Sequence, residues 1–107
     1  MINILIIYLL ILLLFKLIDN NYLRFLLLVF ISIYCIWFFK LKKKKLILII
    51  LLTLSAVITE IIFIKYFKNT WKYYNNDIVN VPYWLFPLWF ICIVFILEIY
   101  KIFIKLN

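Results

Sequence analysis

Two carboxylates, Glu60 and Glu98, lie inside apolar segments of the sequence. A carboxylate in such surroundings must be paired, hydrogen-bonded or neutral, so it can tie helices together or bind a proton or cation. On a helix with about 100° per residue, the small and polar residues around Glu60 fall on one side. That side carries Thr53, Ser55, Ala56, Thr59 and Glu60, and the opposite side carries Ile50, Leu54, Val57, Ile58 and Ile61. Because small and polar residues face other helices in lipid, we expect Glu60 to point inward.

Two roles remain open for Glu60. Donors follow it along the chain in Lys65, the indole of Trp71 and the hydroxyl of Tyr73. A hydrogen-bonded cluster would fix how that loop packs onto the helices, whereas an unpaired carboxylate would be a ligand or proton site. The predicted intramembrane polar cluster comprises Glu60, Thr53, Thr59, Trp71 and Tyr73.

Glu98 has a simpler interpretation. Lys101 follows three residues later, a spacing that brings two side chains together on one helical face. In a bundle that crosses a membrane several times, Glu60 and Glu98 lie at opposite depths. We therefore expect a local ion pair at Glu98 and no proton shared between the two carboxylates.

No catalytic or metal-binding motif is present. Histidine is absent, and Cys35 and Cys92 lie in apolar segments without a neighbouring base. The sequence contains no metal-ligand cluster and no glycine-rich phosphate loop. We accordingly expect no enzymatic activity, no catalytic residue, no cofactor and no metal.

Lysines 42, 43, 44 and 45 form the strongest charge pattern of the chain. A short basic loop between apolar segments favours retention on the cytoplasmic side of a membrane. The same lysines, Lys42, Lys43, Lys44 and Lys45, are candidate contacts for anionic lipids. The net charge of +8 is thus explained without nucleic acid, which we do not expect as a partner.

The apolar segments predict four helices, over residues 2–18, 22–39, 46–64 and 83–104. Residues 46–64 are long enough to cross a hydrocarbon core of roughly 30 Å. The first segment could instead be a signal peptide, but no basic residue precedes its apolar run and no small-residue cleavage site follows it. A basic loop at 40–45 and an aromatic loop at 65–81 are predicted to lie on opposite sides of the membrane.

Three tryptophans near the ends of the apolar segments, Trp37, Trp84 and Trp89, are predicted interface anchors. The composition agrees with a membrane protein, since 71% of the 107 residues are hydrophobic. The predicted fold is all-α, a single integral membrane domain with four transmembrane helices in an up-down bundle. Both termini would share the cytoplasmic side with the lysine run.

One pattern in the second half of the chain combines Glu60, Trp71 and Tyr73 with Pro82, Trp84, Pro87 and Trp89. It resembles a signature of some small, uncharacterised multi-pass membrane proteins. The overall composition is similar to that of membrane proteins from AT-rich giant DNA viruses. The resemblance covers about half of the chain, implies no known activity, and implies that Glu60 and these aromatic residues act as one unit.

Three function classes follow from these observations. The leading one is a structural or interaction component of a membrane, and the resemblance implies a host-cell or viral membrane. The alternative is a small transporter, channel subunit or ion-binding protein that uses the Glu60 face, and a membrane-embedded enzyme is a distant third. The expected partners are the lipid bilayer, anionic lipids, and other membrane helices or further copies of the chain.

Overall fold

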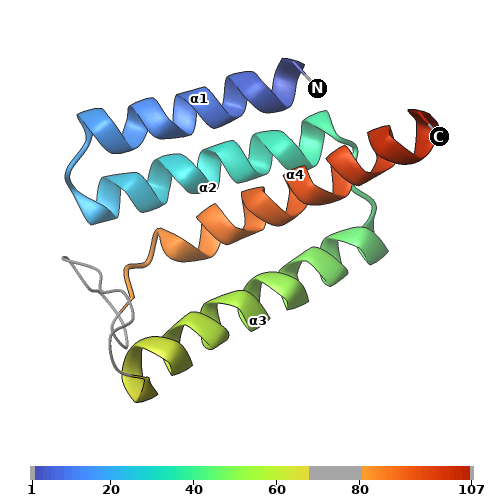
Figure 1. Ribbon diagram of the computed structural model, residues 1–107. Helices are drawn as coiled ribbons and strands as arrows, with labels where there is room; N and C mark the ends of the chain where they lie inside the picture. Colours follow the sequence, from blue (N-terminus) through green and yellow to red (C-terminus); the bar gives the residue numbers. More distant parts are fainter. Residues whose placement is uncertain (1, 68–80, 107) are drawn as a thin grey trace.

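The computed structural model describes residues 2–67 and 81–106, which form four α-helices (Figure 1). The helices are α1 (Ile2–Leu17), α2 (Asn21–Phe38), α3 (Lys43–Tyr66) and α4 (Leu85–Leu106). Successive helices run in opposite directions (Figure 1). The predicted all-α fold with four helices is confirmed.

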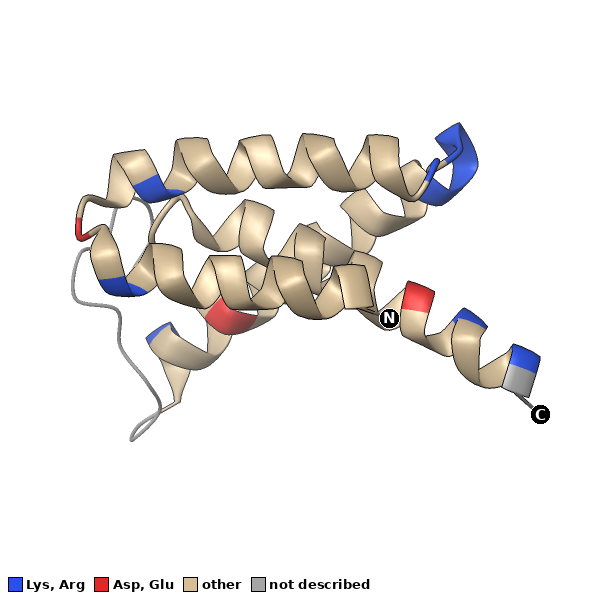
Figure 2. Ribbon diagram, turned by 90° about the horizontal axis from the view of Figure 1, so that it is seen from above, with Lys and Arg blue, Asp and Glu red and all other residues tan. Residues whose placement is uncertain are grey.

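The helices do not lie in space in their chain order. Helix α4 packs against both α2 and α3, whereas α1 flanks α2 on the outside (Figure 1). The α2–α3 connection therefore bridges across α4 at the end of the bundle where the chain begins. The last turns of α4 extend past the other helices at that same end (Figures 1 and 2).

A polar turn joins α1 and α2 into a hairpin. The Asn20 side chain caps α2 by accepting hydrogen bonds from the backbone N–H groups of Tyr22 and Leu23, at 2.8 and 3.2 Å. Arg24 caps the end of α1 by donating to the carbonyl oxygens of Ile18 and Phe15, at 2.5 and 2.9 Å. The Phe15 carbonyl lies in the last turn of α1 and the Ile18 carbonyl directly follows the helix, where α1 itself offers no donors. Arg24 thus stabilises the hairpin.

Helix α2 ends in a Schellman motif built without glycine. The N–H of Leu41 donates to the carbonyl of Ile36, and the N–H of Lys40 donates to that of Trp37, at 3.1 and 3.3 Å. Lys40 takes the left-handed conformation that this motif requires, with φ of 52°. The chain contains no glycine, so a lysine occupies a position that glycine adopts more easily.

The boundaries of α3 and α4 differ by two or three residues from the predicted ones. Helix α3 begins at Lys43 rather than at residue 46, so half of the predicted basic loop belongs to its first turn. Helix α4 begins at Leu85 and continues to Leu106, two residues later at each end than predicted. Pro87 is its third residue, where a missing N–H removes no helical hydrogen bond.

The core is centred on α4, because this helix has neighbours on two sides. Its buried side chains pack with those of the other three helices. The main cluster consists of Ile4, Ile7, Ile11, Leu28, Cys35, Ile49, Phe90, Ile91, Ile93, Val94 and Phe95. A smaller cluster lies towards the end of the bundle where α3 ends and α4 begins, and consists of Val57, Val81 and Leu85.

The outer surface is apolar along most of the bundle. Helices α2, α3 and α4 are each long and apolar enough to cross a membrane. Helix α1 has 16 residues, which correspond to about 24 Å and make it the shortest of the four. Charged residues concentrate towards the helix ends, and the middle of the bundle carries few of them (Figure 2). These properties are compatible with an integral membrane location.

Candidate functional site

Hydrogen-bonding side chains of α4, and of Trp84 directly before it, reach the neighbouring helices at three levels. Trp84 and Trp89 lie at the hairpin end of the bundle, and Glu98 lies towards the end that carries the lysine run. Trp84 directly precedes α4, where its carbonyl accepts the N–H of Leu88, and Trp89 lies in the helix itself. The Trp84 indole reaches Asn21 at the start of α2, and the Trp89 indole reaches Glu60 of α3.

The contact between Trp89 and Glu60 joins α4 to α3. The indole Nε1–H of Trp89 donates a hydrogen bond to Oε2 of Glu60, and both residues are half-buried. An indole is a donor only, so a carboxylate or a neutral carboxyl can serve as its acceptor. Glu60 therefore points into the bundle, as the sequence predicts, and its acceptor function is used in holding two helices together.

Trp84 makes the corresponding contact to the α1–α2 hairpin. Its Nε1–H donates to Oδ1 of Asn21 at 3.0 Å. Its ring also packs edge-on against Phe15, with 4.7 Å between ring centroids, and the Arg24 guanidinium lies 4.7 Å from the same Phe15 ring. Arg24, Phe15 and Trp84 thus form a continuous stack from the hairpin to α4.

Glu98 forms the third contact and pairs with two lysines. Its Oε1 accepts from Lys45 Nζ of α3 at 3.1 Å and lies 3.5 Å from Lys101 Nζ. The Glu98 and Lys45 side chains are only 14% and 25% exposed, so the pair is shielded from solvent by the protein. The predicted Glu98–Lys101 pair is confirmed. Lys45, predicted as a lipid contact together with Lys42, Lys43 and Lys44, instead binds within the chain.

The inward face of α3 is rotated from the predicted one. Thr53 is buried and Val57 is fully buried, whereas Ser55 and Thr59 are exposed. Thr53 and Thr59 each donate to the carbonyl four residues earlier, at 2.8 Å, so neither hydroxyl bonds Glu60 in the described contacts. Among the described helices, α3 packs mainly on α4, through residues spaced by four. Val57 belongs to this stripe, and its predicted lipid-facing position is wrong.

Two members of the predicted cluster, Trp71 and Tyr73, lie outside the described residues. Trp37 is 74% exposed near the end of α2, a position open to the surroundings. Its role as an interface anchor stays a prediction. Trp84 and Trp89, predicted as anchors in the same way, are half-buried and hydrogen-bonded to other helices.

Pattern reasoning on the sequence did not predict the contacts of Asn21, Arg24 and Lys45. All three residues lie near helix ends, where a turn or a membrane interface is already a sufficient reason for a polar side chain. The five-residue spacing of Trp84 and Trp89 could have indicated that the two indoles face different neighbours. Which neighbour supplies each acceptor depends on how the helices pack.

Within residues 2–67 and 81–106, no group of three His, Cys, Asp or Glu side chains is placed to hold a metal ion. Cys35 and Cys92 are both free thiols. The chain matches no protein-family model, no curated protein and no solved structure.

Proposed function

We propose that this chain is a multi-pass integral membrane protein that acts as a structural or interaction component of its membrane. The observation that carries the proposal is the apolar surface that covers the middle of the helices. Large apolar side chains are exposed along all four, for example Leu9, Phe30, Leu51 and Ile96, each at least half exposed. Surfaces of this extent are covered by lipid or by other apolar helices.

The proposed orientation places the lysine-rich end in the cytoplasm. Lys40, Lys42, Lys43 and Lys44 are exposed at the α2–α3 connection, and Lys101 and Lys105 are exposed at the same end. An excess of basic residues in short connections favours the cytoplasmic side. With four crossings, both termini lie there too, and α1 crosses as the shortest helix. The resemblance to viral proteins adds a host-cell or viral membrane as the proposed location.

The proposed function has one direct test, which combines membrane extraction with flux measurements. We expect the chain to stay in the membrane pellet after washing at alkaline pH. Liposomes that contain it should pass protons and potassium no faster than empty liposomes, and chemical crosslinking in the membrane should give a species larger than the monomer. Release into the alkaline supernatant would overturn the membrane location.

The second candidate is a transporter, channel subunit or ion-binding protein centred on Glu60. It is favoured by the position of this carboxyl group between two apolar helices, where an ionisable residue is rare without a role. Glu60→Gln keeps an acceptor for Trp89 but removes the ionisable group. Flux in the parent that Glu60→Gln abolishes would replace the structural function with this one.

A further inference from the structure

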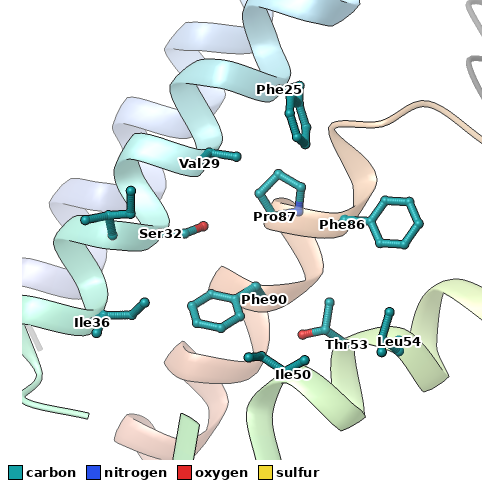
Figure 3. A pocket seen from close by; sticks show the side chains of 11 residues that line it. Phe25, Val29, Ser32, Ile36, Ile50, Thr53, Leu54, Phe86, Pro87 and Phe90 are labelled. Atoms are coloured by element: carbon teal, nitrogen blue, oxygen red, sulfur yellow. The ribbon is translucent and has the colours of Figure 1, made fainter. Parts of the chain in front are cut away.

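An open groove with an apolar lining runs between α2 and α3, with α4 as its floor (Figure 3). Val29 and Ile36 of α2 form one wall, Ile50 of α3 belongs to the other, and Pro87 and Phe90 of α4 lie between them. The groove encloses about 320 Å³. It exists because α2 and α3 both pack on α4 rather than on each other.

The groove accepts an apolar occupant only. Its two hydroxyl groups, on Ser32 and Thr53, already donate to carbonyls of their own helices at 2.8 Å. No other lining residue carries a polar side chain. From Phe25 to Ile36 the groove follows α2 for roughly 16 Å, about half of a hydrocarbon core of roughly 30 Å. Its length thus corresponds to one leaflet of a bilayer.

Basic residues lie at one end of this groove. Since α2 and α3 are its walls, the connection between them follows directly after Ile36 and lies at this end of the groove. Lys40 and Lys42 of the connection and Lys43 and Lys44 of α3 are exposed there. Lysines at the start of a helix oppose its macrodipole, so the stability of α3 does not account for them. An anionic group outside the chain would complement them.

We propose that the α2–α3 groove binds an anionic phospholipid, with one acyl chain along Pro87 and Phe90 and the headgroup phosphate against the lysines of the connection. The proposal rests on the membrane location proposed above. A lipid suits the groove better than a second copy of the chain, because exposed lysines at the end of an apolar groove complement a headgroup phosphate that is joined to an acyl chain.

Native mass spectrometry of the detergent-purified chain tests the proposal with three probes. Phosphatidylglycerol has the anionic headgroup and two chains, phosphatidylcholine with the same chains lacks the net charge, and glycerol 3-phosphate lacks the chains. We expect retention of phosphatidylglycerol well above phosphatidylcholine and none of glycerol 3-phosphate. Equal retention of the two lipids, or retention of glycerol 3-phosphate alone, would overturn the proposal.

Variants separate the headgroup site from the groove. Lys43→Gln with Lys44→Gln should lower phosphatidylglycerol retention by about tenfold or more. The control pair Lys16→Gln with Lys65→Gln removes the same charge from exposed positions at the other end of the bundle and should leave retention unchanged. Equal losses in both pairs would show a general charge effect and contradict a site at the connection.

A bulky side chain in the groove should exclude the acyl chain. Ile50 is 44% exposed and lines the groove, whereas the neighbouring Leu51 is 57% exposed and does not line it. Ile50→Trp should lower retention of both lipids several-fold, and Leu51→Trp should not. Leu54→Trp, at a second lining position, provides the same test if Ile50→Trp unfolds.

Two outcomes would contradict the groove as a lipid site. Unchanged lipid retention in folded Ile50→Trp is one, and a dimer that Ile50→Trp dissociates is the other, since a second copy would then occupy the groove. Either result leaves the membrane location standing, because alkaline extraction of the parent measures that separately.

Discussion

At the scale of single residues, the indole of Trp89 gives Glu60 a structural partner inside an apolar bundle. The sequence did not predict this partner, which is available because α4 returns along α3 and brings Trp89 to the level of Glu60. The predicted donors Trp71 and Tyr73 lie outside the described residues. Burial of a carboxyl group costs less free energy when one of its oxygens accepts a hydrogen bond than when the group is unpaired. The ionisable group at position 60 is therefore compatible with a structural role.

Substitutions at Glu60 test this contact. Glu60→Leu removes the acceptor and leaves the Trp89 indole without it, so unfolding in detergent should become easier by about 1–3 kcal/mol. Glu60→Gln keeps an acceptor oxygen and should lie close to the parent. Trp89→Phe removes the donor, and combined with Glu60→Leu it should cost less than the sum of the two single changes. Thermal unfolding of the four variants and the parent measures all three effects.

Thr59 supplies the control for these variants. Its side chain is exposed on the turn next to Glu60, and its hydroxyl bonds only its own helix in the described contacts. Thr59→Ala should change stability by less than about 0.5 kcal/mol, as is usual for surface positions. If Glu60→Leu proved as stable as Thr59→Ala, the contact with Trp89 would have no structural importance.

At the scale of elements, the ends of the helices are held by different devices. Asn20 caps the start of α2, Arg24 caps the end of α1, and Lys40 closes α2 in a left-handed conformation. The side chains of Asn20 and Arg24 are well suited to capping a helix. Lys40 is poorly suited to its position, since a residue with a Cβ atom is strained at positive φ.

Lys40→Gly should therefore stabilise the chain. Removal of the strain is worth about 1 kcal/mol, although glycine also makes the unfolded chain more flexible. Lys44→Gly is the matched control, because residue 44 lies in the first turn of α3, where φ is negative and glycine is a poor helix former. A higher unfolding temperature for Lys40→Gly than for the parent, with no gain for Lys44→Gly, is the expected result. Destabilisation by Lys40→Gly would contradict strain at this position.

The four helices were predictable from the sequence because each is a long apolar run between polar turns. The helix boundaries were harder to predict, since Lys43 is a good helix former and extends α3 into the predicted loop. The inward face of α3 was misplaced because Ser55 and Thr59 satisfy their hydroxyls locally and need no neighbour. Trp84 and Trp89 suit a membrane interface and a helix contact equally well, and only packing distinguishes the two.

At the scale of the whole molecule, α4 connects the bundle. It contacts α3 through Trp89 and Glu98, Trp84 directly before it contacts the start of α2, and its buried apolar residues form the centre of the core. The chain order α1–α2–α3–α4 thus becomes α1–α2–α4–α3 in space (Figure 1). This arrangement leaves apolar grooves on the surface, including one beside the lysine-rich end.

Labelling of cysteines at the two ends of α3 tests most directly whether the chain crosses a membrane with the lysine run inside. In a background with Cys35→Ala and Cys92→Ala, single cysteines replace Lys43 and Lys65, which are exposed at opposite ends of the helix. We predict that an impermeant thiol reagent added outside intact cells labels Lys65→Cys, and labels Lys43→Cys only after the membrane is opened. Labelling of both from one side would contradict a membrane-spanning α3, and the reverse pattern would contradict the proposed orientation.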